Sequence, residues 1–179
     1  MGLGSKVAIN VSYTRERALS EVRKEIGIVD VASNSLDRIL AGHVPRIGSM
    51  AWSPDGRWIA SGASMLESKG DGKWIRDPDP LRIWEATTGD LALSFSGTYD
   101  PITKLAWHPS SAILATVSAK GNGELGSALR LWSILQRRMI FEYLVPNSMI
   151  TQVSFDPQSA HLVVGLEGGL RVFEIRNVP

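Results

Sequence analysis

The sequence GHVPRIGSMAWSPDGRWIASG occupies residues 42–62, and LRIWEATTGDLALSFSG follows at residues 81–97. Short apolar runs alternate here with Gly, Pro and Asp, which favour turns and are disfavoured inside strands. The pattern predicts four sequential antiparallel strands, at residues 49–53, 58–64, 81–86 and 91–95. The rest of the chain consists of variations on this unit.

Four residues mark the repeat at its third strand. Val29, Trp84, Trp132 and Phe173 follow one another at intervals of 55, 48 and 41 residues. A repeat of about 40–45 residues with four strands is typical of a propeller blade. The order Gly-His, Ser-Pro-Asp-Gly, Trp followed by an acid, and Thr-Gly also resembles one WD repeat of a β-propeller. The resemblance implies an all-β fold with little helix.

The predicted architecture is an incomplete β-propeller of about 14 strands, or three and a half blades, in one domain over residues 1–179. We letter the strands of a blade a to d from the propeller axis outward. Strands b–d of the first blade lie in 6–41, two full blades follow at 43–97 and 98–145, and strands a–c of the last lie in 149–176. The first blade lacks strand a and the last lacks strand d. The chain is a segment of a longer propeller, half of a homodimer or a divergent short form.

Composition narrows the classes of function. The 179 residues carry a formal net charge of +1, so no global charge points to nucleic acid or to an anionic membrane. The absence of cysteine excludes disulfides and thiolate metal sites. No apolar run approaches the ~20 residues of a membrane-spanning helix, and no secretory signal precedes the first strand. We expect an intracellular protein, in the cytoplasm or nucleus, without a cofactor or metal.

The resemblance also implies a structural hydrogen-bond relay inside the blades. In WD repeats it joins the Trp of strand c, a Ser or Thr of strand b, a His before strand a and an Asp in the b–c turn. His43, Ser61 and Trp84 match three of these places, whereas the insertion at 65–80 leaves the Asp unassigned. Thr116 and Trp132 match two places in the following blade. Buried indole and imidazole groups need partners, so His43 is interpreted as structural rather than catalytic.

Catalysis and nucleic-acid binding are the alternative classes of function. A propeller enzyme of the hydrolase type would place acids or histidines on its inner strands, but those strands offer only Lys104. The G-x-G-x-x-G sequence at 121–126 runs into a predicted strand, where a dinucleotide site needs a helix. Asp77 and Asp79 alternate with prolines, which is more typical of a stiff loop than of a calcium site. Nucleic-acid binding would require clustered cations with stacking aromatics.

The favoured function is a non-catalytic scaffold for protein–protein interaction, binding a protein or peptide partner. Long insertions at 14–24, 65–80 and 120–127 all join strands b and c, so they should converge on one face. The predicted hot spot on that face is Trp74 with Lys73 and Arg76. A positive rim that favours an acidic partner would be added by Arg15, Arg17 and Arg46. The unpaired strand edges at both ends also favour self-association.

Overall fold

The computed structural model describes residues 6–11, 25–44, 46–64, 67–69, 73–75, 77–97, 100–120, 125–158 and 161–176. All regular structure within these ranges is β. The strands are β1 (Lys6–Val11), β2 (Glu25–Asp30), β3 (Ser35–Ala41), β4 (Ile47–Trp52), β5 (Trp58–Ala63), β6 (Glu67–Lys69), β7 (Lys73–Ile75), β8 (Leu81–Glu85), β9 (Leu91–Phe95), β10 (Ile102–Trp107), β11 (Ile113–Ala119), β12 (Gly126–Ser133), β13 (Arg138–Pro146), β14 (Ile150–Phe155), β15 (His161–Leu166) and β16 (Gly169–Glu174).

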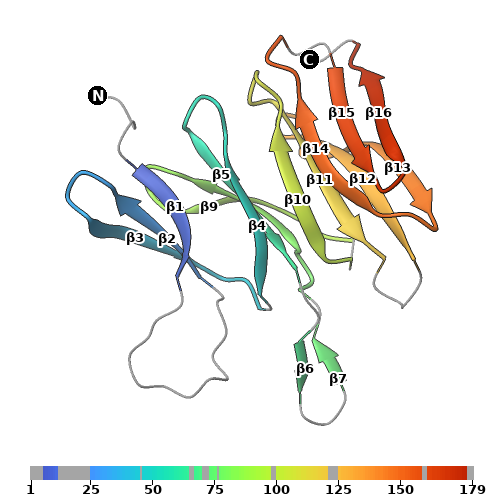
Figure 1. The fold of residues 1–179 in the computed structure, drawn as a ribbon. Coiled ribbons are helices and arrows are strands. Elements are labelled where there is room, and N and C mark those ends of the chain that lie inside the picture. Colours follow the sequence, from blue (N-terminus) through green and yellow to red (C-terminus); the bar gives the residue numbers. More distant parts are fainter. Residues whose placement is uncertain are drawn as a thin grey trace.

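Four antiparallel sheets follow one another along the molecule as the blades of a partial β-propeller (Figure 1). Their strand orders are β1-β2-β3, β4-β5-β8-β9, β10-β11-β12-β13 and β14-β15-β16. The fold class predicted from the sequence is thus confirmed, with three strands in each terminal sheet and four in each central sheet. The insertion at 65–80 departs from the prediction of a plain loop, because β6 and β7 form a separate two-stranded hairpin there.

The innermost strands of the last three sheets, β4, β10 and β14, share one irregularity. Each skips a residue in its pairing with the next strand, between Ile47 and Ser49 in β4 and at the corresponding places in β10 and β14. Such a β-bulge bends a strand and increases its twist. The three strands lie side by side, and Trp107 Nε1 on β10 donates a hydrogen bond of 3.0 Å to the backbone oxygen of Ala51 on β4.

The turns repeat their backbone geometry from sheet to sheet. Asn34, Gly89 and Arg137 each stand five residues after the third-strand marker, and each has a positive φ, of 50°, 84° and 53°. Gly56 and Ser111 likewise share a positive φ in the turns after β4 and β10. This left-handed conformation is routine for Gly and tolerated by Asn. The same turn geometry therefore closes blades whose sequences differ.

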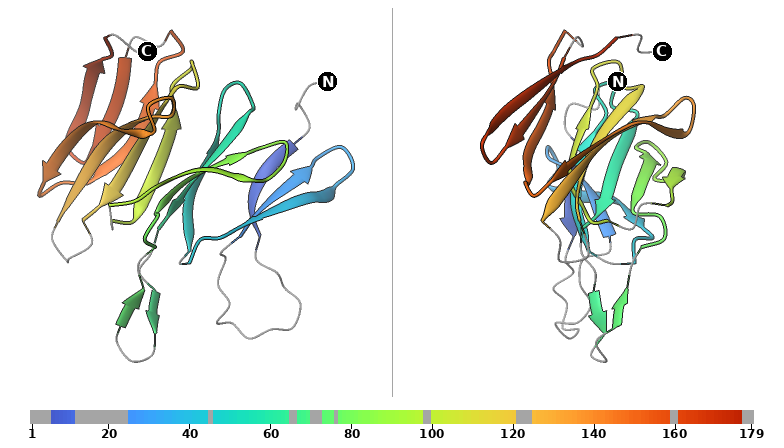
Figure 2. Two further views of the ribbon diagram at one scale, coloured as in Figure 1. Left: turned by 180° about the vertical axis from the view of Figure 1, so that it is seen from behind. Right: turned by 90° about the vertical axis from the view of Figure 1, so that its right-hand side faces the viewer.

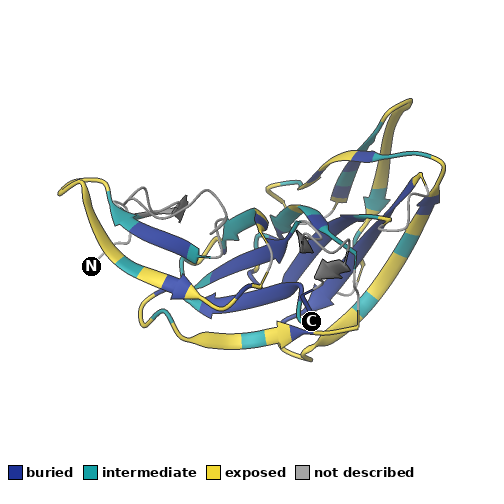
Figure 3. Ribbon diagram, turned by 90° about the horizontal axis from the view of Figure 1, so that it is seen from below, coloured by how far each residue is buried: buried dark blue, intermediate teal, exposed yellow. Residues whose placement is uncertain are grey.

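The middle strands of the two four-stranded sheets are largely buried, whereas the outermost strands are largely exposed (Figure 3). All eight residues of β12 are buried, whereas most of β13 is exposed. Three apolar clusters fill the spaces between neighbouring sheets. They centre on Ile28 and Trp84 between the first two sheets, on Ile83 and Trp132 between the second and third, and on Leu129 and Val164 between the third and fourth. These clusters hold the sheets together in series.

Strand direction gives the array two distinct faces. The β6–β7 hairpin projects from the lower side in Figure 1, where β1 and β11 end and β2 and β12 begin (Figures 1 and 2). We call this side the hairpin face. The turns that join β4 to β5 and β10 to β11 lie on the opposite side. A search of the described residues for a helix with the length and apolar character needed to span a bilayer finds none.

Candidate functional site

A buried hydrogen-bond relay crosses the second sheet beneath the hairpin. Trp84 Nε1 on β8 donates to Ser61 Oγ on β5 at 2.8 Å. Ser61 Oγ lies 2.7 Å from His43 Nε2, and His43 Nδ1 lies 2.9 Å from Asp77 Oδ2. All four residues are at most 3% exposed. Asp77 therefore stands in the place that sequence analysis left unassigned.

The carboxylate of Asp77 accepts hydrogen bonds from four residues. Besides His43, its carboxylate accepts bonds from the backbone N–H of Asp79 at 3.0 Å and of Val44 at 3.3 Å. Arg82 Nη2 completes the set at 3.1 Å. A buried carboxylate is tolerated only when it is paired and hydrogen-bonded in this way. The segment that ends the insertion is consequently fixed to the blade.

Which atom donates in each hydrogen bond of the relay follows from the ionisation states of His43 and Asp77. Burial lowers the pKa of His43, against the opposing effect of its hydrogen bond to Asp77. Burial alone would raise the pKa of Asp77, but the bonds from His43 and from the backbone of Asp79 hold it below its ordinary value. Neutral His43 then donates from Nδ1 to the ionised carboxylate and accepts at Nε2 from the Ser61 hydroxyl. Every donor in the relay thus points toward Asp77.

The third sheet contains a shorter version of the relay. Trp132 Nε1 on β12 donates to Thr116 Oγ1 on β11 at 2.9 Å. Where the second sheet has His43, this sheet has no histidine in contact with the threonine among the described residues. The neighbouring polar cluster centres instead on Arg130, which contacts Ser118 Oγ at 2.5 Å, Glu142 Oε1 at 2.7 Å and Asp100 Oδ2 at 3.4 Å. Arg130 is 7% exposed, so these contacts compensate the burial of its charge.

Sequence analysis did not assign roles to Asp77, Arg82 or Arg130. Asp77 was interpreted as part of a stiff loop because it alternates with prolines inside the insertion, and it lies 34 residues from His43 in the chain. A signal for the arginines is present, because Leu-Arg-x-aromatic occurs at 81–84, 129–132 and 170–173. The arginine stands two residues before the marker of the repeat in all three cases. Its position is visible in the sequence, whereas its partners differ in each blade.

The residues predicted to bind a partner fall partly outside the described ranges. Lys73 and Trp74 belong to β7, whose backbone is described although these side chains are not. Arg15, Arg17 and Arg76 lie outside the described residues. Arg46 is exposed directly before β4. The structure thus places the backbone of Trp74 on the projecting hairpin and leaves the grouping of these side chains as a prediction.

The base of the hairpin is tied to the second sheet on both sides. Ala63 N donates to Pro80 O, and Ser64 N donates to Arg46 O, each at 2.8 Å. Together with the buried Asp77, these bonds fix the chain where the insertion leaves β5 and where it returns to β8. The hairpin therefore stands on a rigid base, which is where proteins commonly carry binding segments.

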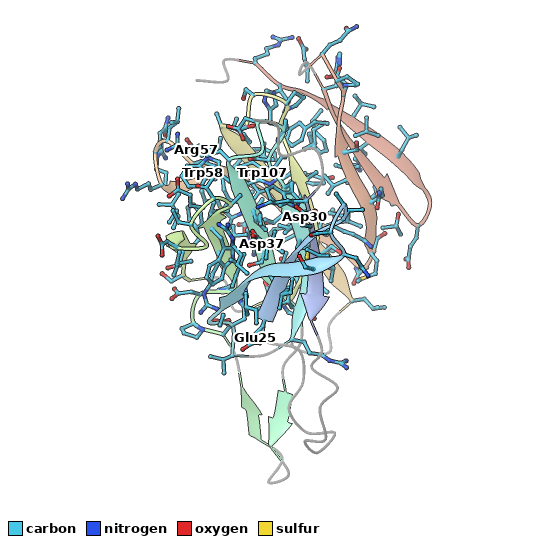
Figure 4. The ribbon with its side chains drawn as sticks, turned by 90° about the vertical axis from the view of Figure 1, so that its left-hand side faces the viewer. Glu25, Asp30, Asp37, Arg57, Trp58 and Trp107 are labelled. Atoms are coloured by element: carbon cyan, nitrogen blue, oxygen red, sulfur yellow. The ribbon has the colours of Figure 1, made fainter. Side chains whose placement is uncertain are left out.

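The face opposite the hairpin carries an arginine and a tryptophan, the same two residue types as the predicted hot spot. The guanidinium carbon of Arg57 lies 4.5 Å from the ring centroid of Trp58, in a cation–π contact at the start of β5. Figure 4 shows both residues at the end of the molecule away from the hairpin. In the same view Glu25, which begins β2, lies toward the hairpin face. Neither face holds a group of three or more potential metal-ligating side chains among the described residues.

Comparison with known proteins agrees with this architecture. The family model described as "WD domain, G-beta repeat" matches residues 34–74 and 89–133. The chain is similar to the Periodic tryptophan protein 2 homolog of Neurospora crassa, with 28% identity over 70% of this chain and 12% of the relative. It is also similar to WD repeat-containing protein 36 of Homo sapiens, with 28% identity over 68% of this chain and 12% of that protein. Ribosome biogenesis protein ERB1 of Debaryomyces hansenii is 32% identical over 46% of this chain and 9% of the relative. The matches therefore span about a tenth of the length of these relatives.

Proposed function

Because the chain carries WD repeats of the β-propeller type, we propose that it is a non-catalytic interaction scaffold whose hairpin face binds a protein or peptide partner. The observation that carries the proposal is the β6–β7 hairpin, which projects from a base fixed by buried bonds. Because the base of the hairpin is held in place before binding, less conformational entropy is lost when a partner binds. The same domain organisation, one propeller segment over residues 1–179, is part of the proposal.

Within the hairpin we assign the central contact to Trp74, with Lys73 and Arg76 beside it. Trp and Arg dominate the energetics of many interfaces because they combine a large contact area with directed hydrogen bonds. The arginines at 15, 17 and 46 would surround this contact with positive charge and favour an acidic segment. The five relay residues, His43, Ser61, Trp84, Thr116 and Trp132, keep a structural role in this proposal.

The names of the relatives indicate a setting for such a scaffold. One is named a ribosome biogenesis protein, and another is named for its WD repeats. We therefore propose protein partners inside the cell, in the nucleus or cytoplasm. Catalysis in the central channel receives no support from the inner strands, whose one charged side chain is Lys104. Nucleic-acid binding lacks a dense cationic stripe.

A phage-displayed library of random peptides tests the proposal. Peptides selected on the full chain should be enriched in Asp and Glu and should bind through the hairpin face. Trp74→Ala combined with Arg76→Ala should weaken the selected peptides by at least about tenfold, because loss of a hot-spot residue costs about 2 kcal/mol or more. Circular dichroism would verify that the variant keeps its β structure.

The matched control carries the same two changes on the opposite face, Arg57→Ala with Trp58→Ala. This control should leave peptide affinity within about twofold. The proposal of the hairpin face fails if the control abolishes binding and the hairpin variant does not. Selection of basic rather than acidic peptides would refute the acidic partner while leaving the face intact.

A further inference from the structure

The outer strand of the third sheet, β13, leaves one long edge open. It pairs with β12 on one side, and no other described strand pairs with it (Figure 1). The outer strands β3, β9 and β13 each skip one residue in their pairing, which is a β-bulge. The regular stretch after the bulge has four residues in β3 (38–41), three in β9 (93–95) and six in β13 (141–146). We call residues 141–146 the open stretch of β13.

The backbone groups that face outward on the open stretch are identified by a hydrogen bond at its end. Asn147 N donates to Leu125 O at 3.1 Å, so these two residues form a hydrogen-bonded pair. Such pairs alternate with non-hydrogen-bonded pairs along an antiparallel ladder. The register is continuous through the open stretch, so the N–H and C=O groups of Glu142 and Leu144 point away from β12. Pro146, which has no N–H, stands at the next outward position, where the ladder with β12 requires no donor.

The side chains beside these outward groups combine apolar surface with an unbalanced charge. Leu144 is 54% exposed. Glu142 lies on the same face of the strand, two residues away, and accepts a bond from Arg130 Nε at 2.7 Å. Asp100 Oδ2 lies 3.4 Å from Arg130 Nη2, so two carboxylates share one guanidinium. The side chain of Glu142 is 37% exposed, which leaves its carboxylate accessible to a further cation.

The other outer strands carry more protection against pairing with another chain. Charged side chains, prolines, bulges and short length all discourage such pairing at an edge. In β3 the paired charges of Asp37 and Arg38 lie at the bulge, and β9 has only five residues. The open stretch of β13 contains one charged residue, Glu142, and its proline stands last. This stretch is therefore the outer edge best suited to accept an additional strand.

We propose that the open stretch of β13 binds an extended peptide segment of a partner protein as an additional antiparallel strand. Backbone hydrogen bonds at Glu142 and Leu144 hold the peptide, and the neighbouring side chains select its sequence. The peptide residue opposite Leu144 is apolar, and the residue two places later, opposite Glu142, is Lys or Arg. This site belongs to the third sheet and does not use the β6–β7 hairpin.

The choice of a peptide rather than a second copy of this chain follows from charge. The carboxylates around Arg130 call for a cation opposite Glu142, because opposite charges across paired strands are stabilising and like charges are destabilising. Residues 141–146 contain no Lys or Arg, so the open stretch of a second copy does not supply that cation.

The probe is the peptide Val-Thr-Ile-Thr-Lys-Thr with blocked ends, which places Ile opposite Leu144 and Lys opposite Glu142. Fluorescence anisotropy of the labelled peptide with the full chain measures its affinity. Replacement of Lys by Glu should weaken binding at least about threefold, because a like charge then faces Glu142. N-methylation of the Ile removes a donor that faces β13 and should weaken binding at least about fivefold. N-methylation of the following Thr, whose N–H points away from β13, is the matched control and should leave affinity within about twofold.

Leu144→Pro tests the same edge from the side of the protein. Proline removes the outward N–H and leaves the ladder with β12 intact, as Pro146 does two residues later. Peptide affinity should fall at least about tenfold, with the β signal in circular dichroism unchanged. Leu91→Pro is the matched control on β9 and should leave affinity within about twofold. Leu91 also stands at an outward position, because Glu85 N donates to Asp90 O in the adjacent pair.

Three results would overturn the proposal without any change to the protein: no binding up to about 1 mM peptide, equal affinity of the Lys and Glu peptides, or equal affinity of the two N-methylated peptides. Loss of binding in Trp74→Ala with Arg76→Ala would overturn it by assigning the peptide to the hairpin face. A dimer in sedimentation equilibrium that Leu144→Pro dissociates would overturn it by assigning the edge to a second copy.

Discussion

The relay of the second sheet predicts a large cost for a small change, Ser61→Ala. The hydroxyl of Ser61 joins two buried groups, the indole N–H of Trp84 at 2.8 Å and Nε2 of His43 at 2.7 Å. Its removal leaves both groups without this partner, and each buried unsatisfied group costs about 1–3 kcal/mol. The expected loss in the free energy of unfolding is therefore about 2–6 kcal/mol. This is a large share of the ~5–15 kcal/mol that stabilises a typical domain.

Thr116→Val provides the internal comparison. The threonine hydroxyl accepts from Trp132 at 2.9 Å, and valine preserves the branched shape while removing the oxygen. One buried donor is then unpaired, so the expected loss is about 1–3 kcal/mol, half of that for Ser61→Ala. Equilibrium unfolding in urea at a fixed protein concentration measures both losses through the midpoint and slope. Ser94→Ala, on the exposed strand β9, should change stability by less than about 0.5 kcal/mol. Equal losses for Ser61→Ala and Thr116→Val would refute the reasoning.

Two further predictions concern pH and the contact between sheets. Burial holds the pKa of His43 in the folded chain below its ordinary value of about 6.5. As the pH falls below that value, His43 is therefore protonated in the unfolded chain before it is protonated in the folded chain. Stability should therefore decline from that pH downward through the lower folded pKa, and His43→Gln should flatten this part of a melting-temperature profile. Trp107→Phe removes the donor to Ala51 O and should lower stability by about 1–3 kcal/mol. Unfolding in urea checks this value, and an unchanged midpoint would show that the bond does not couple the second and third sheets.

The strands were predictable because their signals are local. Apolar alternation and turn residues recur within each blade, and the turns close with residues that tolerate a positive φ, such as Asn34 and Gly89. The marker at Trp84 and Trp132 located the third strand in both central sheets. The β6–β7 hairpin was missed because each of its strands has only three residues, too few to show a period of two. Its formation depends on the pairing of Glu67 with Ile75, which no local pattern reveals.

The polar clusters were only partly predictable because their partners are distant in the chain. The resemblance named His43, Ser61 and Trp84, and the structure brings these three into hydrogen-bond contact. It could not name Asp77, since the insertion displaces the acid from its usual spacing. Arg130 is a harder case, because its contacts come from β11, β13 and the segment before β10. A sequence pattern fixes the position of such an arginine but not the carboxylates that surround it.

The two central blades therefore bury different polar groups at corresponding places. The difference depends on whether a long insertion joins the second and third strands of the blade. In the second sheet, the carboxylate of Asp77 lies at the end of a long insertion and gathers donors from His43, Arg82 and the backbone. In the third sheet the charge at the centre is that of Arg130, which pairs with Glu142 on the neighbouring strand β13 and with Asp100 before β10. A carboxylate on the returning segment anchors that segment directly, whereas an arginine within the strand braces the sheet. The hairpin is thus fixed at its base by the residue that ends it, which is the property that the proposed binding face requires.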